Sequence, residues 1–311
     1  MKLHLRKLAI VGGALALAAW LGFIAIRYYH LDNQAGRWWR GDRIGADWND
    51  SGKWAGESTL WLPEYRFDIE NRRIEGVDRN LSGLAWDSDD NRLLATVNRP
   101  ASLLILSTEG AVRSRHVLAD TGDAEGIAYL GDDRVAVLLE GQRMVRIFRL
   151  PTAGHVGPMT AERSVQLDMP DSGNDGPEGL AYDQANDTLY ITKERAPRGI
   201  LKVPHFQHSA RARATPMDMP EWVAAMPFVT DLASIEFDPV NRSLLLLSDE
   251  SRMLVEIDED GSPISTNELP ASFGQLPVPQ AEGVAVDDQG TIFMVSEPNL
   301  FYRLKRDTPV L

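Results

Sequence analysis

One four-residue phrase, glutamate followed by glycine, an apolar residue and alanine, recurs at three distant points of the chain. It occupies Glu125–Ala128, Glu178–Ala181 and Glu282–Ala285. Each copy lies in an apolar segment, and related segments, "LSGLAWD" and "LASIEFD", begin at Leu81 and Leu232. These five openings, at 81, 124, 177, 232 and 281, lie 43 to 55 residues apart. Such a period predicts a repeat architecture, because a sandwich or open sheet explains short strands but not a shared phrase.

Each unit continues with more short strands after its opening. A turn rich in Asp, Asn and Gly follows, such as "SDDNR" or "GDDR", and suits a hairpin. A second and a third apolar strand come next, and four units add a more polar fourth strand. For the third unit we expect that strand at Asp218–Met226, "DMPEWVAAM". Four antiparallel strands per unit predict an all-β fold, a β-propeller.

The last unit lacks a fourth strand, because the sequence ends at Leu311 after its third. An unpaired strand, "EYRFDIENR", precedes the first unit at Glu64–Arg72. We expect it to complete the last blade and close a ring of five four-stranded blades; six blades would need a unit that the sequence does not show. The glycine of the phrase is expected where neighbouring first strands approach closely.

Acidic and amide residues recur at two positions of the units. Glu125, Glu178 and Glu282 begin three first strands. The second strands end in Asn98, Glu140, Glu194, Asp249 (or Glu250) and Glu297. In an antiparallel hairpin the start of one strand lies beside the end of the next, so the sequence predicts two stacked rings at one mouth of the channel.

Carboxylates this close together are costly unless they are protonated, paired or bound to a cation. Oxygen ligands of this kind suit Ca²⁺, which predicts a calcium site formed by the acids of both rings and Asn98. The alternative is that the acids cap strand ends and pair with basic residues between blades. The nearby basic residues are Arg99, Lys193, Arg195 and Arg252.

The N-terminus predicts a membrane anchor over residues 1–30. An uncharged apolar run of 19 residues, Leu8–Ile26, follows Lys2, Arg6 and Lys7. This length spans a bilayer as a helix, and the basic flank predicts a cytoplasmic N-terminus. A cleavable signal peptide is the alternative. Both place the rest of the chain outside the cytoplasm, and the first makes it a single-pass protein of a bacterial inner membrane with its propeller in the periplasm.

Two further regions follow the anchor. Residues 31–62 hold five of the eight tryptophans and are expected to form a linker that folds back on the membrane surface or the domain. Residues 63–311 are expected to form the propeller. Without residues 1–30, which contain four basic residues and no acid, the net charge of −13 becomes −17. This charge argues against nucleic acid as a partner.

The phrases also resemble a known family. "NLSGLAWD" at Asn80–Asp87, the glutamate–glycine phrases and the strand ends "TVNR" and "ITKE" are similar to the SdiA-regulated domain family, the YjiK-like envelope proteins. The resemblance implies a β-propeller facing the periplasm and no known reaction. More distantly, the mouth acids resemble those of calcium-dependent propellers such as gluconolactonases, paraoxonases and phytase-like esterases, which implies Glu125, Glu178, Glu282 and Asn98 as ligands.

Two functions follow as hypotheses. The first is a membrane-anchored periplasmic propeller that binds an envelope protein or a small ligand. The second is a calcium-dependent hydrolase of an ester, lactone or phosphoester, with the mouth acids as metal ligands. The sequence favours the first, because it contains no nucleophile motif such as G-x-S-x-G.

Overall fold

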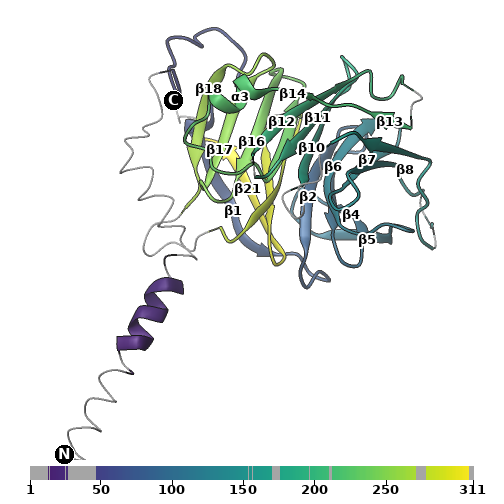
Figure 1. Ribbon diagram of the computed structural model, residues 1–311, viewed down its shortest axis with the longest axis horizontal. Helices are drawn as coiled ribbons and strands as arrows, with labels where there is room; N and C mark the ends of the chain where they lie inside the picture. Colours follow the sequence, from purple (N-terminus) through teal and green to yellow (C-terminus); the bar gives the residue numbers. More distant parts are fainter. Residues whose placement is uncertain are drawn as a thin grey trace, which may run out of the picture.

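The computed structural model describes residues 47–307 except 153, 156, 170–175, 196, 210–211 and 271–277, and helical residues at 13, 15–24 and 26. Five β-sheets radiate from a common centre (Figure 1). The innermost strand of each sheet contacts the innermost strands of both neighbours, and the last contacts the first. The predicted five-bladed propeller is therefore confirmed.

The first two blades follow the predicted order of strands. Blade 1 consists of β2 (Leu81–Asp87), β3 (Arg92–Val97), β4 (Ser102–Leu106) and β5 (Val112–Val117). Blade 2 consists of β6 (Ala124–Gly131), β7 (Arg134–Leu139), β8 (Met144–Arg149) and β9 (Arg163–Leu167), with β13 (Arg213–Ala214) added in parallel to β9. Since β13 comes from the segment after the third strand of blade 3, it ties the rim of blade 2 to its neighbour.

The remaining blades complete the ring. Blade 3 consists of β10 (Pro177–Asp183), β11 (Thr188–Lys193), β12 (Gly199–Pro204) and β14 (Met217–Asp218). Blade 4 consists of β15 (Ser234–Asp238), β16 (Ser243–Ser248), β17 (Met253–Asp258) and β18 (Pro263–Glu268). Blade 5 consists of β19 (Ala281–Val286), β20 (Ile292–Ser296), β21 (Leu300–Arg306) and β1 (Tyr65–Arg73).

The strand expected at Glu64–Arg72 closes the ring. As β1 it pairs antiparallel with β21, from Tyr65 opposite Arg306 to Arg73 opposite Leu300. The short 3₁₀ helix η1 (Leu62–Glu64) leads into it. The first strand of the domain therefore forms the outer edge of the blade built from the end of the chain.

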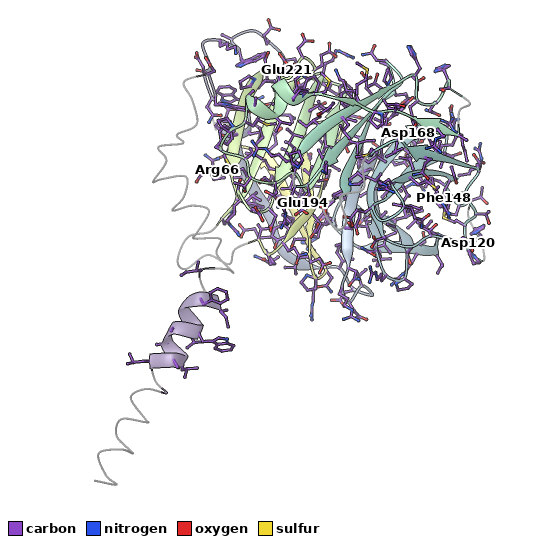
Figure 2. The ribbon with its side chains drawn as sticks, viewed as in Figure 1. Arg66, Asp120, Phe148, Asp168, Glu194 and Glu221 are labelled. Atoms are coloured by element: carbon purple, nitrogen blue, oxygen red, sulfur yellow. The ribbon has the colours of Figure 1, made fainter. Side chains whose placement is uncertain are left out.

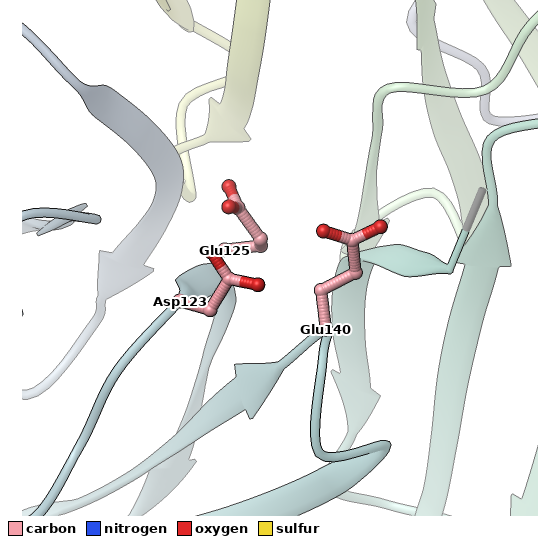
Figure 3. Close-up of side chains that lie close together, drawn as sticks. All are labelled: Asp123, Glu125 and Glu140. Carbon is pink, nitrogen blue, oxygen red and sulfur yellow. The ribbon is translucent and has the colours of Figure 1, made fainter. Parts of the chain in front are cut away.

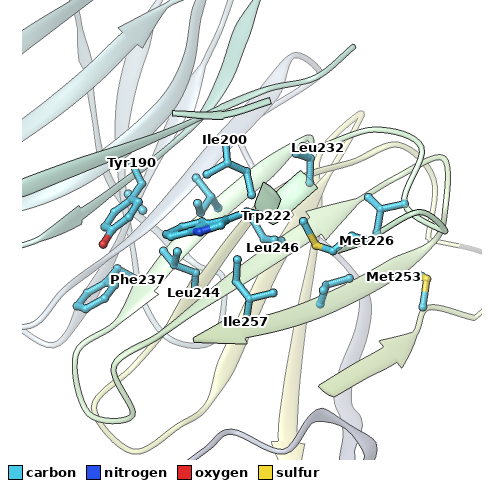
Figure 4. Close-up of a cluster of buried hydrophobic side chains, with 14 of the residues drawn as sticks. Tyr190, Ile200, Trp222, Met226, Leu232, Phe237, Leu244, Leu246, Met253 and Ile257 are labelled. Carbon is cyan, nitrogen blue, oxygen red and sulfur yellow. The ribbon is translucent and has the colours of Figure 1, made fainter. Parts of the chain in front are cut away.

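The prediction of a fourth strand at Asp218–Met226 is wrong for most of this segment. The helix α3 (Pro220–Ala224) follows the two-residue strand β14. Pro220 favours the first turn of a helix because its φ is fixed and its missing N–H would be unpaired there. Trp222 is buried in the core between blades 3 and 4, among Tyr190, Ile200 and Leu244 (Figure 4).

Residues 47–62 pack on the outside of blade 4. The N–H groups of Leu60 and Trp61 donate to the buried carboxylate of Glu256 at 2.7 and 3.1 Å, and Trp48 packs edge-on against Phe228. The described residues do not include 31–46 of the expected linker. Of the expected anchor they include 13, 15–24 and 26. Within the described part of the chain, no helix combines the length and apolar character that crossing a membrane requires.

The inner strands approach one another as closely as the repeated glycine predicts. A Cβ built on Gly83 would lie 2.5 Å from the carbonyl oxygen of Glu125, and one on Gly126 would lie 2.5 Å from that of Glu178. Gly283 continues the pattern with Ser82, at 2.7 Å. Because the obstructing atoms belong to the backbone, no side-chain movement makes room for a methyl group.

The opposite end of the channel carries the hairpin turns between inner and second strands. Four turns begin with an aspartate whose carboxylate accepts N–H groups of the turn; these are Asp87, Asp183, Asp238 and Asp287. Such Asx turns satisfy the backbone locally. These aspartates therefore serve the hairpins and lie away from the acids that begin the inner strands.

We expect Gly126→Ala to lower the free energy of unfolding by about 2 kcal/mol or more, because the added methyl overlaps neighbouring backbone. Gly122→Ala is the matched control, since a Cβ there meets no atom within 4 Å. Chemical denaturation of both variants measures the difference. Equal stability of the two would contradict the close approach of the inner strands.

Candidate functional site

The candidate site is the mouth of the channel, the end at which the inner strands begin. There each second strand ends beside the start of its inner strand, and in four blades the same backbone bond joins the two. The N–H donors are Asn98, Glu140, Glu194 and Glu297, and the carbonyl acceptors are Asn80, Asp123, Gly176 and Gln280, in that order. The structure therefore places the residues of the two expected rings side by side. Figure 2 shows Glu194 near the middle of the propeller, with Glu221 and Asp168 toward its rim.

Residues at the ends of the second strands reach across to the next blade. Asn98 of blade 1 donates from its amide to the Glu125 carboxylate of blade 2. Glu140 of blade 2 accepts the N–H of Gly176, before blade 3, at 3.0 Å.

The same direction holds farther around the ring. Arg195 pairs with Glu194 of blade 3 and, at 3.3 Å, with Glu250 of blade 4. Asp249 of blade 4 accepts the N–H of Ala281, the first residue of β19, at 2.8 Å. The acids of the second ring thus connect neighbouring blades. These contacts stabilise part of the negative charge of the ring without a bound ligand.

Glu125 is held in a defined orientation by neutral groups. Ser82 Oγ donates to its Oε2 at 2.5 Å, and the Asn98 amide donates to Oε1. Burial raises the pKa of Glu125 to about 7, and the neighbouring charges of Asp123, Glu140 and Glu297 act in the same direction although the Ser82 bond opposes them. A carboxyl group with this pKa is balanced between its protonated and charged forms near neutrality.

Glu178 and Glu282 are the other two first-ring acids. Burial raises the pKa of Glu178 well above its usual range, as do the Glu194 charge and a side-chain hydrogen bond with Glu194. Burial likewise raises the pKa of Glu282, whose Oε1 accepts a bond from the Gln280 amide at 2.9 Å. At neutral pH we therefore expect Glu178 to stay protonated.

Three acids form a compact group at the blade 2 side of the mouth. One oxygen each from Asp123, Glu125 and Glu140 lies within 4.8 Å of the others. Figure 3 shows Asp123 and Glu125 together at the start of β6, with Glu140 at the end of the neighbouring strand. Among the described residues this is the one such group of three potential metal ligands, so Glu178, Glu194, Glu282 and Glu297 do not belong to it.

Asp123 was not among the ligands expected from the sequence. The signal was present, because Asp123 stands two positions before Glu125 in "DAEG", at the same end of the same strand. The equivalent residues of the other blades are Asn80, Gly176, Asp231 and Gln280. Blade 2 is thus the blade with an acid at all three mouth positions.

Asn98 offers a further oxygen beside this group. Its Oδ1 is buried without a hydrogen-bond partner, while its Nδ2 donates to Glu125. Buried polar atoms are nearly always satisfied, so this acceptor beside the carboxylates is a position at which a hydrogen-bond donor, an ordered water or a cation can bind.

The raised pKa values predict that the stability of the metal-free protein falls as pH rises from about 4.5 to 8. In this window the unfolded chain has released the protons that the folded chain still holds on Glu125, Glu178 and Glu282. Part of this pH-dependent loss of stability, of the order of 3 kcal/mol, comes from Glu125, because its pKa rises from 4.5 to about 7 on folding. Glu125→Gln should remove that part. Denaturation at pH 5 and pH 8 measures the slope, with the exposed Glu57→Gln as control. An unchanged slope in Glu125→Gln would refute the shift.

This chain is similar to solved structures and matches a protein-family model. Among solved structures, the chain is similar to a chain of a nidogen/laminin complex, with 13% identity, a TM-score of 0.44, and coverage of 70% of this chain and 73% of that one. It is also similar to streptogramin B lyase, with 11% identity, a TM-score of 0.46, and coverage of 80% and 99%. Residues 57–305, from before the closing strand into β21, match the model of the SdiA-regulated family. The chain therefore belongs to the SdiA-regulated family.

Proposed function

We propose that this protein is a membrane-anchored β-propeller of the bacterial envelope that binds a ligand through a calcium ion at the channel mouth. The observation that carries the proposal is the group of Asp123, Glu125 and Glu140, whose oxygens lie within 4.8 Å of one another. Ca²⁺ binds oxygen ligands at about 2.3–2.6 Å, so ligands on opposite sides of one ion lie up to about 5 Å apart. The group has the spacing of such a ligand set.

Two further observations support a cation here. The Oδ1 of Asn98 is a buried acceptor that no donor satisfies, and amide oxygens are ordinary calcium ligands. Around Glu125, the charges of Asp123 and Glu140 both raise its pKa, so a divalent cation would relieve a repulsion that the structure otherwise bears. When bound, the ion supplies a Lewis acid with positions left for ligand oxygens.

The other expected ligands have different roles in this proposal. Glu194 pairs with Arg195, and Glu178 is bonded to Glu194. Burial raises the pKa of Glu297, and the positive charge of Arg79 opposes part of this rise. We therefore assign the calcium ion to the blade 2 side of the mouth and leave the other side neutralised by protonated Glu178 and Glu282 and by arginine.

The location of the propeller rests on residues 1–30. Their basic flank and 19-residue apolar run support a single-pass anchor in the inner membrane, with a cytoplasmic N-terminus and the propeller in the periplasm. The partner is then a soluble ligand or another envelope protein that reaches the mouth.

Calcium titration of the full-length protein should show saturable binding and a melting temperature that rises by several degrees at a hundredfold excess over Kd, by linkage. Asp123→Asn and Glu125→Gln should each weaken binding at least tenfold. The affinity should be higher at pH 8 than at pH 6, because the ion competes with the proton on Glu125.

The matched control for these variants is Glu57→Gln, which removes one exposed acid outside the mouth and should keep wild-type affinity. Equal weakening in all three variants would show a general charge effect. No binding at millimolar calcium would refute the proposal.

A second candidate function, calcium-dependent hydrolysis of an ester, lactone or phosphoester, is favoured by one observation. Glu178 and Glu194 form a hydrogen-bonded acid pair at the same mouth. Such a pair supplies a proton donor and acceptor, which metal-assisted hydrolysis also requires.

For this second function, turnover of lactone, aryl ester and phosphodiester substrates with calcium should fall about a hundredfold or more in Glu178→Gln. Retained calcium affinity in that variant would separate catalysis from ion binding. Turnover that is no higher than the Glu178→Gln background for all three classes would exclude the hydrolase.

A further inference from the structure

A hollow between blades 1 and 2 opens beside the acidic group of Asp123, Glu125 and Glu140. Its volume is about 540 Å³, and it reaches the group through Asn98 and Asp123, both of which line it. One wall is apolar, formed by Pro100, Ala101 and Val117. Val117 is 48% exposed although it is a large apolar side chain, so this wall presents apolar surface to solvent.

Two charged side chains line the hollow, Arg99 and Asp123. The Arg99 guanidinium is 75% exposed and makes one ion pair, from Nη2 to Asp123 Oδ1 at 3.2 Å. Arg195, another arginine of the mouth, is instead held between Glu194 and Glu250. Because its guanidinium is largely exposed, Arg99 directs most of its five N–H donors to solvent.

The rim of the hollow is held in place from blade 2. Arg146 donates to the carbonyls of Ala119 and Asp120, at 3.3 and 2.5 Å, and to Thr121 Oγ1 at 3.3 Å. Thr121 itself lines the hollow. The segment that forms the rim is therefore held in place before a ligand binds, and a ligand would not have to order it.

A cation and Arg99 compete for the same carboxylate. An ion bound to Asp123 would share that carboxylate with Arg99, so the negative charge would compensate the guanidinium less. The hollow would then contain a metal ion at one end and a less compensated arginine in its lining, and both attract an anion. Arg99 presents parallel N–H groups that match carboxylate or phosphate oxygens.

We propose that this hollow is the ligand site of the propeller and that it takes a small oxyanion, a carboxylate or a phosphate monoester, with a short apolar group. The oxyanion contacts Arg99 and the ion, and the apolar group lies on Pro100, Ala101 and Val117. The inference rests on the proposed calcium function and adds the class of ligand. By linkage the coupling is reciprocal, so calcium strengthens anion binding and the anion strengthens calcium binding.

Calorimetric titration of the full-length protein with hexanoate and hexyl phosphate, with and without saturating calcium, tests the proposal, and hexanamide is the neutral probe of the same length. We expect at least one of the two anions to bind about tenfold or more tightly with calcium, and hexanamide to show no such gain. Arg99→Gln should weaken that anion at least tenfold, because a hydrogen-bonded charge pair is lost. The relative affinities of the two anions identify the preferred head group.

Arg113→Gln is the matched control, since it removes an exposed arginine from β5 of the same blade and leaves the hollow unchanged. It should keep wild-type anion affinity. Calcium titration of Arg99→Gln without anion should give an affinity equal to or above that of the wild type, because the competing guanidinium is gone.

The outcomes separate this inference from the function on which it rests. Normal calcium binding with no anion bound, or with anion affinity unchanged in Arg99→Gln, would overturn the oxyanion site and leave the calcium function intact. Absent calcium binding in the wild type would overturn the calcium function and, with it, the coupling. If Arg113→Gln lost as much anion affinity as Arg99→Gln, the loss would come from the change in net charge. This outcome would overturn the assignment of the site to Arg99.

Discussion

The close approach of five inner strands around one axis is the constraint on which this molecule depends. A methyl group on Gly83 or Gly126 would overlap the backbone of the next blade, so at these positions the strands meet at a distance that only glycine allows. The residue before each of these glycines begins the same strand. Whatever stands there is therefore brought near its counterparts in other blades, and in this chain it is an acid three times. The packing of the ring and the chemistry of its mouth have the same origin.

Convergence of acids costs free energy, and the mouth reduces the cost in two ways. Some carboxylates accept N–H groups or pair with arginine across a blade boundary, as Glu140 does with Gly176 and Glu250 with Arg195. Others are expected to stay protonated, as Glu178 is beside Glu194, because burial raises its pKa. The three acids of blade 2 have neither remedy in full, which is why the proposed cation is placed there. The charge pattern is thus asymmetric although the fold is nearly symmetric.

The architecture could be predicted from the sequence because every blade repeats the same strand order and the unpaired strand at Glu64–Arg72 had one vacant position to fill. The segment Asp218–Met226 escaped because its apolar residues fit a strand as well as a helix, and Pro220 and the burial of Trp222 decide for the helix. The equivalent positions of the repeated units also predicted which residues gather at the mouth. It could not show which of them meet, since the contact of Glu140 with Gly176, or the proximity of Asp123 to Glu140, depends on the offset between blades and on side-chain reach.

The pairing of β1 with β21 has a consequence for the order of events during synthesis. The ribosome makes β1 first among the strands and β21 last, and blade 5 holds them side by side. The ring therefore cannot close until β21 has been made, and until then the inner edges of the early blades lack a closed channel around them. A chain without β21 would carry an open, strand-edged surface of the kind that aggregates, so the propeller is exposed to misassembly for the whole time that separates the synthesis of these two strands.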